Sequence, residues 1–164
     1  MMKPKYGCSA NNRDNSGWTP LFCACSKGQL RICEVLLAEG KLSLSFCLFN
    51  ALNNDPLLGA TASIKSNDQA NVLHYFVRNK LEDTILATKV LNGLLENGAD
   101  VDCQNINGET ALHIAAARGT TLCVEFLLQH NASPNLTDKL SINRATQILA
   151  WAHMHLFKLT KSFF

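Results

Sequence analysis

An eight-residue block that occurs twice is the feature that most constrains the fold of this chain. Residues 14–21 (Asp-Asn-Ser-Gly-Trp-Thr-Pro-Leu) align with residues 105–112 (Asn-Ile-Asn-Gly-Glu-Thr-Ala-Leu). Both are followed at identical offsets by an alanine, a glycine and a leucine pair: Ala24, Gly28, Leu36 and Leu37 in the first copy, and Ala115, Gly119, Leu127 and Leu128 in the second. A recurrent unit of this size predicts a solenoid, whose function resides on a binding surface rather than in a catalytic cleft.

A third, weaker copy lies between these two. Leu73 and His74 stand where Leu112 and His113 stand in the last copy. Residues 94–99 then close this unit with a leucine pair, an asparagine, a glycine and an alanine. The sequence therefore contains three repeats, of which the middle one is the least regular.

Two insertions interrupt the spacing of the copies. Leu73 and Leu94 are 21 positions apart where the other copies have 15, which places a six-residue insertion near residues 79–83. A second insertion of about 19 residues, at about 43–65, precedes the middle copy. With both removed the period is 33 residues, and we expect the repeats at about 14–46, 66–104 and 105–137.

Capping residues divide each repeat into a turn, a helix, a second turn and a second helix. Thr19 and Thr110 suit the N-cap position, and Pro20 suits the first helical position, where its missing N–H costs no hydrogen bond. Glycine or asparagine follows the helices where a left-handed C-cap is needed, at Gly28, Gly40, Gly98, Gly119 and Asn131. Each unit carries a leucine stripe that only a neighbouring unit can cover, so stability depends on stacking.

These repeats resemble those of the ankyrin-repeat family, and the resemblance covers residues 7–138. The Thr-Pro-Leu-His-x-Ala signature is met at residues 19–24, with phenylalanine for histidine, and at residues 110–115, with alanine for proline. In the middle unit Gln69 replaces the turn glycine, and the threonine, proline and alanine are lost. The resemblance implies an all-α solenoid of stacked helix-turn-helix units with hairpin tips, formed by residues 1–138 and followed by a capping or tail helix at 139–164.

Ankyrin proteins usually bind partners with their hairpin tips and the exposed face of their first helices, so the resemblance points to the non-consensus residues there. These are Asn15, Ser16, Trp18, Ser26 and Lys27 in the first repeat; Asp68, Ala70, Arg78 and Asn79 in the second; and Ile106, Asn107, Glu109, Ala117 and Arg118 in the third. Trp18 has two interpretations: it projects from the hairpin as a binding hot spot, or it packs on the neighbouring hairpin.

The resemblance also implies a modification. Many ankyrin proteins are hydroxylated on an asparagine in the hairpin after the leucine pair, and Asn135 stands eight residues after Leu127 at that position.

Composition and charge exclude several other functions. The net charge is only +2 and no dense Lys/Arg cluster occurs, so binding to nucleic acid is not expected. The cysteines are odd in number, and Cys8, Cys23, Cys25, Cys33 and Cys123 fall on apolar or small positions of the repeat, so we expect them to fill the core. Cys23-x-Cys25 with His153-x-His155 has the wrong spacing for a zinc finger. No metal or cofactor is expected.

No catalytic site is visible in the sequence. His74 and His113 have no serine, cysteine or carboxylate at a recurring offset that would make a nucleophile–base pair. The resemblance makes this histidine a structural residue at the helix start. Glu82 and Asp83 are explained as the cap and first-turn charge of the following helix. We therefore expect a protein that is not an enzyme.

Two segments lie outside the repeat pattern. The insertion at 43–65 is apolar at its start and fits a strand or a short helix, of which we favour the helix; its apolar side covers the stack or forms a partner patch. Residues 142–164 carry a helical apolar stripe. That helix caps the third repeat, binds a partner or a membrane surface, or is the unstructured end of a shortened isoform.

The sequence therefore predicts a monomeric, non-catalytic adaptor or scaffold that binds a protein partner. No signal peptide or membrane span is visible, so we expect the cytoplasm or the nucleus. A second interpretation is a regulatory or targeting segment of a larger signalling protein, such as a small-GTPase regulator. A third is a membrane-associated protein held by its C-terminal helix.

Overall fold

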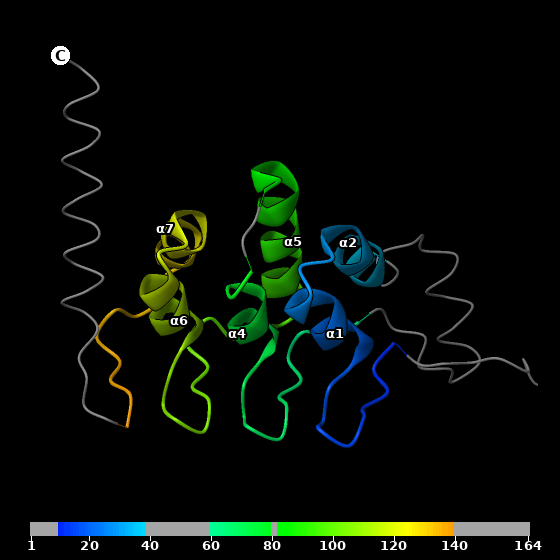
Figure 1. Cartoon of the computed structure of the whole chain (residues 1–164), viewed down its shortest axis with the longest axis horizontal. Helices are drawn as coiled ribbons and strands as arrows, with labels where there is room; N and C mark the ends of the chain where they lie inside the picture. Colours follow the sequence, from blue (N-terminus) through cyan, green and yellow to red (C-terminus); the bar gives the residue numbers. More distant parts are fainter. Residues whose placement is uncertain (1–9, 39–59, 80–81, 140–164) are drawn as a thin grey trace, which may run out of the picture.

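The computed structural model describes residues 10–38, 60–79 and 82–139. These ranges contain six helices and no strand: α1 (Pro20–Ser26), α2 (Leu30–Ala38), α4 (Val72–Phe76), α5 (Thr84–Glu96), α6 (Ala111–Arg118) and α7 (Thr121–Gln129). The helices form three consecutive pairs that coincide with the three sequence repeats (Figure 1). The predicted all-α solenoid is confirmed. The predicted helix within 139–164 and most of the 43–65 insertion lie outside the described residues.

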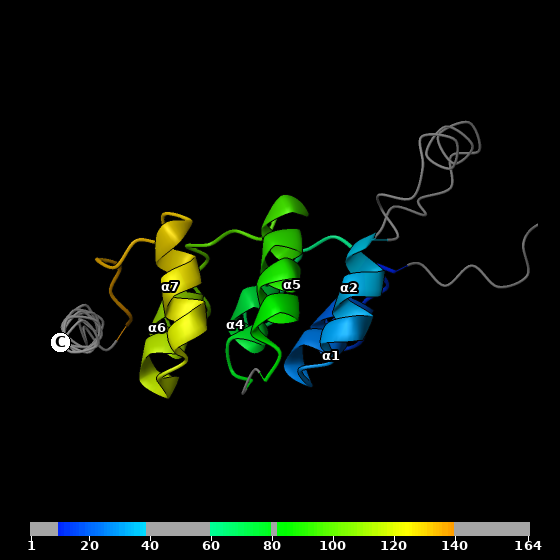
Figure 2. The same ribbon diagram turned by 90° about the horizontal axis from the view of Figure 1, so that it is seen from above.

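Two layers of helices run along the row of repeats. α1, α4 and α6 form one layer, and α2, α5 and α7 form the other (Figures 1 and 2). The hairpins extend from the first layer, away from the second. Successive repeats pack like against like, with α1 on α4, α2 on α5 and α4 on α6.

The leucine stripe lies where stacking requires it. Leu21, Leu73 and Leu112 occupy equivalent positions on the first helices and are at most 1% exposed. Truncating a leucine buried to this extent typically costs about 2–5 kcal/mol. The core continues without interruption through all three repeats, so no repeat has a core of its own.

Two of the first helices begin with a reciprocal cap between side chain and backbone. At the start of α6 the Thr110 hydroxyl lies 2.8 Å from Nδ1 of His113, and the Thr110 N–H donates to the same nitrogen. On α4 the Asn71 N–H likewise donates to Nδ1 of His74, and the Asn71 side-chain oxygen accepts from the Leu73 N–H. In α1 phenylalanine replaces the histidine, so Thr19 stands at the predicted N-cap but its buried hydroxyl has no hydrogen bond among the described residues.

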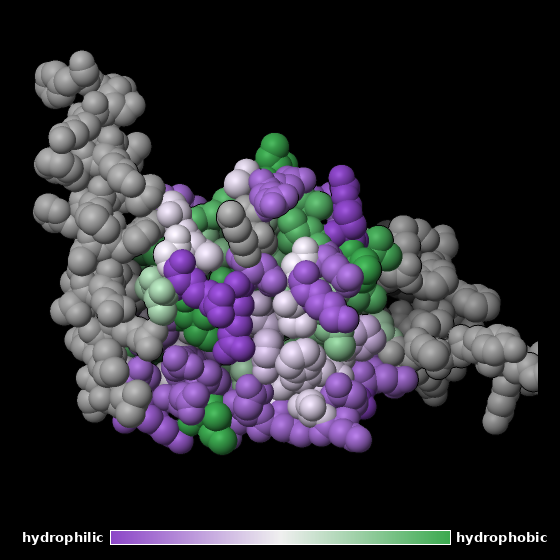
Figure 3. Space-filling model, in the orientation of Figure 1, coloured by the Kyte–Doolittle hydropathy of each residue, from purple (hydrophilic) through white to green (hydrophobic). Residues whose placement is uncertain are grey.

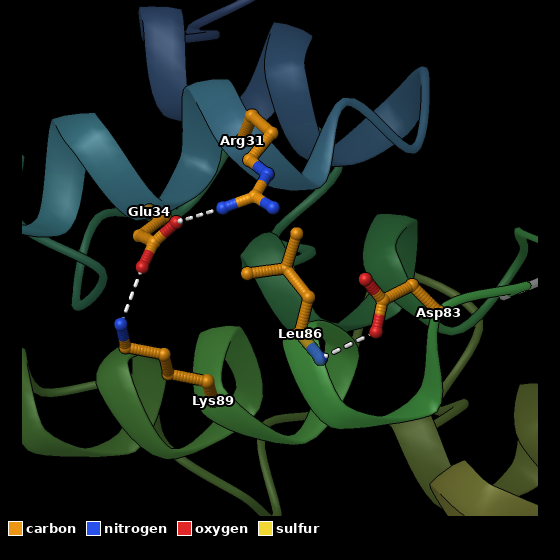
Figure 4. Close-up of polar contacts among 5 residues, drawn as sticks. All are labelled: Arg31, Glu34, Asp83, Leu86 and Lys89. Atoms are coloured by element: carbon orange, nitrogen blue, oxygen red, sulfur yellow. Dashed lines mark hydrogen bonds and ion pairs between the residues drawn. The ribbon is translucent and has the colours of Figure 1, made fainter.

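The six-residue insertion in the middle repeat lengthens a helix and a loop. α5 has 13 residues, whereas α2 and α7 have nine each. The extra turn lies at the N-terminus of α5, where the Asp83 carboxylate accepts a hydrogen bond from the Leu86 N–H at 2.9 Å (Figure 4). Asp83 is thus the predicted cap, while Glu82 lies before the helix instead of in its first turn.

An exposed ion-pair network links the second helices of the first two repeats. Lys89 on α5 pairs with Glu34 on α2 at 2.5 Å, and Arg31 approaches the other oxygen of Glu34 at 3.5 Å (Figure 4). The hydrogen bond from Lys89 lowers the pKa of Glu34. Exposed pairs of this kind contribute little to stability, so the α2–α5 contact depends on apolar packing.

The described end of the predicted insertion belongs to the stack. Ala60 and Ala62 are buried; the Ala60 N–H donates to the Leu36 carbonyl and the Ala62 N–H donates to the Asn97 carbonyl, each at 3.1 Å. Residues 60–65 precede the second hairpin just as residues 99–104 precede the third. They therefore close the first repeat.

Of the four described cysteines with a predicted place in the core, Cys25, Cys33 and Cys123 are buried. Cys103 is buried as well, and Cys8 lies outside the described residues. Cys23 is exposed, so its predicted place in the core is wrong. Ile114, at the equivalent position of the third repeat, is 7% exposed. Burial at this position therefore depends on which side chains of the neighbouring repeat cover it.

Backbone hydrogen bonds join the hairpin tips in one direction. The Asn67 N–H donates to the Ser16 carbonyl at 3.1 Å, the Ile106 N–H to the Asp68 carbonyl at 2.8 Å, and the Lys139 N–H to the Asn107 carbonyl at 2.9 Å. Each tip therefore donates to the preceding tip, which fixes the spacing of the hairpins.

The middle hairpin retains the left-handed turn without glycine. Gly17 and Gly108 both have φ near +77°, and Gln69 at the equivalent position has φ +59°. A non-glycine residue in this region costs about 1–2 kcal/mol, because its Cβ crowds the following carbonyl oxygen. The replacement of the turn glycine by Gln69 therefore strains the backbone locally, while the turn itself is preserved.

We expect Gln69→Gly to stabilise the protein by about 1 kcal/mol, since the relieved steric cost exceeds the added entropy of the unfolded chain. Urea denaturation followed by circular dichroism measures the change. Gln69→Ala is the matched control, because it removes the same side chain but keeps the strained Cβ. Equal midpoints for the two variants would contradict this explanation.

Candidate partner-binding face

The twelve residues selected from the sequence divide into two groups by exposure. Seven are exposed: Asn15, Ser16, Lys27, Arg78, Ile106, Asn107 and Arg118. Five are half-buried: Trp18, Ser26, Asp68, Asn79 and Glu109. Of the two alanines considered with them, Ala117 is exposed but Ala70 is 1% exposed and offers no surface.

Tyr75 on α4 organises the first-helix face of the first two repeats. Its ring meets Trp18 edge to face with centroids 4.8 Å apart, and it meets Phe22 in the same manner at 5.6 Å. Aromatic pairs in this geometry contribute about 0.5–1.5 kcal/mol beyond the area that they bury. Trp18 therefore packs on the neighbouring repeat, which was the second of its two interpretations, and remains half-buried there.

A carboxylate fixes the other end of Tyr75. The phenol O–H donates to Asp68 in the second hairpin, with distances of 2.9 and 3.2 Å to its two oxygens. Burial opposes the charge on Asp68, but hydrogen bonds from Ser66 and Tyr75 outweigh it and lower the pKa of this carboxyl. Burial and the nearby carboxylate raise the pKa of Tyr75. The phenol stays protonated and Asp68 stays ionised near neutral pH.

Arg78 completes the group from above the tyrosine ring. Its guanidinium carbon lies 5.2 Å from the ring centroid, a cation–π distance, and the side chain is exposed. We call Trp18, Asp68, Tyr75 and Arg78 the Tyr75 cluster. Trp18, Asp68 and Arg78 were predicted from the sequence, but Tyr75 was not. The feature that could have revealed Tyr75 is its large polar ring at the position that Cys23 and Ile114 occupy in the other repeats.

Asn79 and Arg118 join neighbouring repeats. The Asn79 amide donates to the Cys25 carbonyl of the preceding repeat at 2.6 Å, and also to the Phe76 and Tyr75 carbonyls at 3.0 and 3.2 Å. Arg118, at the equivalent position, donates to the Arg78 carbonyl at 3.2 Å. Asn79 thus satisfies a carbonyl in the last turn of α1, and Arg118 satisfies one just beyond the end of α4.

A hollow opens beside these residues. Its volume is about 530 Å³, and the residues that line it are Arg78, Asn79, Arg118, Gly119, Thr120, Thr121, Leu122 and Cys123. Two arginines therefore line the hollow, and no acidic side chain among the described residues forms an ion pair with either.

The hairpin tips form a polar edge with one apolar residue. Figure 3 shows hydrophilic residues over the tips and a single hydrophobic area near the base of the molecule. Asn15, Ser16 and Asn107 are exposed there, and Ile106 is 51% exposed. The tips thus offer amide and hydroxyl groups, which suit hydrogen bonding to another protein.

His74 is a structural residue. Its Nε2 faces the Glu109 carbonyl at 2.9 Å, which can only accept, so Nε2 carries the proton and Nδ1 accepts from the Asn71 N–H. Burial lowers the pKa of His74. The hydrogen bond to Glu109 opposes this effect, the charge of Arg78 adds to it, and Asn71 and Asp68 also oppose it, with the pKa lowered overall. The neutral ring therefore links the second repeat to the third, as the resemblance implied.

Three further predictions bear on the site. Asn135 is exposed, and its modification stays a prediction. Nowhere in residues 10–38, 60–79 and 82–139 do three or more His, Cys, Asp or Glu side chains converge as metal ligands. Over the same ranges no helix has the length and apolarity needed to cross a bilayer.

Comparison with known proteins identifies the family. Models of ankyrin repeats match residues 5–37, 44–138 and 73–155, so the chain belongs to the ankyrin-repeat family. Ankyrin repeats generally mediate protein–protein interaction.

Relatives of very different names share this stretch. The chain is similar to a palmitoyltransferase AKR1 of Lachancea kluyveri (37% identity over 74% of the chain), an L-asparaginase of Dirofilaria immitis (31% over 79%) and an oxysterol-binding protein-related protein 1 of Mus musculus (29% over 80%). The matches cover 14%, 23% and 18% of these proteins, so the chain spans less than a quarter of their length.

We expect Asn79→Ala to destabilise the protein by about 1–2 kcal/mol, because it leaves the partly buried Cys25 and Phe76 carbonyls without their donor. Chemical denaturation in urea measures this loss. Lys27→Ala is the matched control at the equivalent position of the first repeat, where the side chain is exposed. A comparable loss in both variants would show that Asn79 does not join the repeats.

Stability should fall as the pH drops through the range in which His74 titrates. Its pKa is lowered in the folded state, so protonation favours the unfolded chain; the contribution is present above the unfolded pKa of about 6.5 and is lost below it. Urea midpoints at several pH values, compared with His74→Gln, isolate this effect from that of the carboxylates. An equally steep pH dependence in the variant would contradict it.

Proposed function

We propose that this chain is a non-catalytic interaction module, an adaptor or scaffold, that binds a protein partner through its hairpin tips and first-helix face. The observation that carries the proposal is the Tyr75 cluster. The middle repeat loses the family signature and instead supplies Tyr75, Arg78 and Asp68, which together with Trp18 hold an aromatic and charged group on this face. Tryptophan and arginine are among the residue types most enriched in binding hot spots, and Tyr75, itself only 7% exposed, holds Trp18 and Arg78 in place.

Rigidity supports this role. Tyr75 is held by two aromatic rings and a carboxylate, and the hairpins are joined by backbone hydrogen bonds. A surface that is already ordered loses little conformational entropy on binding, so more of the contact energy appears as affinity.

The charges favour an acidic partner at one end of the face. Arg78 and Arg118 border the hollow between the second and third repeats without acidic partners among the described residues. Glu82 and Asp83 lie between the first and second repeats instead, where they line a different groove. A carboxylate of the partner would fit beside the two arginines, where a guanidinium group can bind it with two hydrogen bonds.

Two observations support the absence of catalysis from this segment. His74 uses both ring nitrogens in structural hydrogen bonds, which leaves neither for proton transfer. Cys23 is exposed, and no histidine or acidic side chain in residues 10–38, 60–79 and 82–139 forms a hydrogen bond with its thiol that would activate it. We further propose that the chain acts as a monomer in the cytoplasm or nucleus, with membrane contact only through residues 142–164.

A second function is a regulatory or targeting segment within a larger signalling protein, such as a small-GTPase regulator. The observation that favours it is the small share of each relative that the chain matches, at most 23% in the three proteins compared. A longer transcript that encodes a further domain in frame would support this alternative.

Affinity capture from cell lysate, with identification by mass spectrometry, tests the proposal. We expect Trp18→Ala combined with Arg78→Ala to reduce recovery of bound proteins at least about tenfold, since a hot-spot residue contributes roughly 2 kcal/mol or more. Ile32→Ala combined with Ile85→Ala is the matched control, because both residues are exposed on second helices. Thermal unfolding must show that both variants are folded at the assay temperature.

The outcome separates the possible surfaces. Proteins that are retained by the control and lost by the first variant support the first-helix face. Proteins that are retained by both variants, or lost equally from both, contradict it. If the affinity for a captured partner does not fall as the salt concentration rises, the proposed role of the two arginines is contradicted.

A further inference from the structure

Two cysteines face each other inside the first repeat. Cys25 lies on α1 and Cys33 lies on α2, with their sulfur atoms 3.4 Å apart and both residues 0% exposed. The equivalent positions hold Val77 and Leu91 in the second repeat, and Ala116 and Val124 in the third. An apolar pair is therefore sufficient for the fold at this place, and the thiol pair calls for a chemical explanation.

We propose that Cys25 and Cys33 are an oxidation site, at which the two thiols close to a disulfide that joins α1 to α2. A disulfide bond is about 2.05 Å long, so the sulfurs need to approach by only about 1.4 Å. The side chains already meet across the helix pair, with their sulfur atoms in contact.

The hydrogen bond between the thiols prepares one of them to react. With Cys25 as donor, this bond lowers the pKa of Cys33 and raises the pKa of Cys25, whose burial raises it further. The thiolate is the reactive form of cysteine. Cys33 is therefore the sulfur that reacts first, and Cys25 is the sulfur that closes the bond.

A peroxide, such as hydrogen peroxide, supplies the oxidising equivalents. The Cys33 thiolate attacks one peroxide oxygen, the O–O bond breaks, and the leaving hydroxide takes a proton to become water. The Cys25 thiol then loses its proton and attacks the sulfenic sulfur of Cys33, whose S–O bond breaks to release a second water. Two thiols and one peroxide thus give one disulfide and two waters.

The other described cysteines lack this arrangement. Burial raises the pKa of Cys103 and raises that of Cys123 to about 11, so neither forms a thiolate readily. Cys103 directs its sulfur to backbone carbonyls of Gln69 and Gln104. Cys23 is exposed, and among the described residues only Cys25 and Cys33 place their sulfurs within hydrogen-bond reach of each other.

Burial determines the kinetics and the consequence of the reaction. An oxidant reaches the pair only when α1 and α2 open locally. Once formed, the disulfide prevents these two helices from separating. Oxidation would therefore keep the helices of the first repeat together. It would also fix the part of the first-helix face that lies on α1 and next to Trp18.

Peptide mapping of the full chain tests the proposal. The folded protein is treated with hydrogen peroxide in native buffer, remaining thiols are blocked, and the digest is analysed without reduction. We expect a cross-linked species that joins the peptides of Cys25 and Cys33, lighter by two hydrogen atoms and reversed by dithiothreitol. Circular dichroism during treatment must show unchanged helical content.

Matched variants fix the assignment. Cys23→Ser should leave the cross-link unchanged, since Cys23 shares a peptide with Cys25 but is not the proposed partner. Cys25→Ala and Cys33→Val, which copy the third repeat, should each abolish it. A cross-link that persists in either variant, that requires urea, or that is replaced by separate oxidation of Cys33 with Cys25 still free would overturn the proposal.

Discussion

The whole structure depends on the burial of a leucine stripe that no repeat can cover by itself. Leu21, Leu73 and Leu112 are inaccessible only because like helices of successive repeats pack together. The polar interactions at the same junctions are secondary in energy but select the geometry. Asn79 and Arg118 reach back to carbonyls of the preceding repeat, and His74 reaches forward to the next hairpin. The first-helix face is continuous because these contacts set the stagger of the helices.

Much of the fold could be predicted because the repeat encodes it locally. The caps, the left-handed turns and the spacing of Leu73 and Leu112 depend on residues a few positions apart, so a single sequence contains the necessary signal. The candidate site was only partly predictable. Trp18 and Arg78 stood out as non-consensus residues, but their contact with Tyr75 depends on how two repeats stack. For the same reason the exposure of Cys23 could not be predicted, since the equivalent Ile114 is apolar and buried.

The departures of the middle repeat have a common physical pattern. Gln69 retains the turn despite steric cost, Asn71 replaces threonine yet preserves the cap, and α5 gains a turn without disturbing the packing of α2 on α5. The scaffold is preserved while the residues that it displays change. Tyr75 illustrates this, because a larger ring at a variable position contacts Trp18 and Phe22 of the first repeat as well as Asp68 and Arg78 of its own.

The hydrogen bonds between hairpin tips give the row of repeats a direction and a rule for its growth. The second and third tips each present one N–H to the preceding tip and one carbonyl to the following one, so adding or removing a whole unit restores the same junction. A few extra residues inside a tip would instead shift its register against both neighbours. The extra turn of α5 lies at the N-terminus of that helix, in the layer away from the tips, and the residues that separate Ala38 from Ala60 follow α2 in the sequence. Length variation in such an array is thus tolerated between helices and between whole units, but not where the units connect.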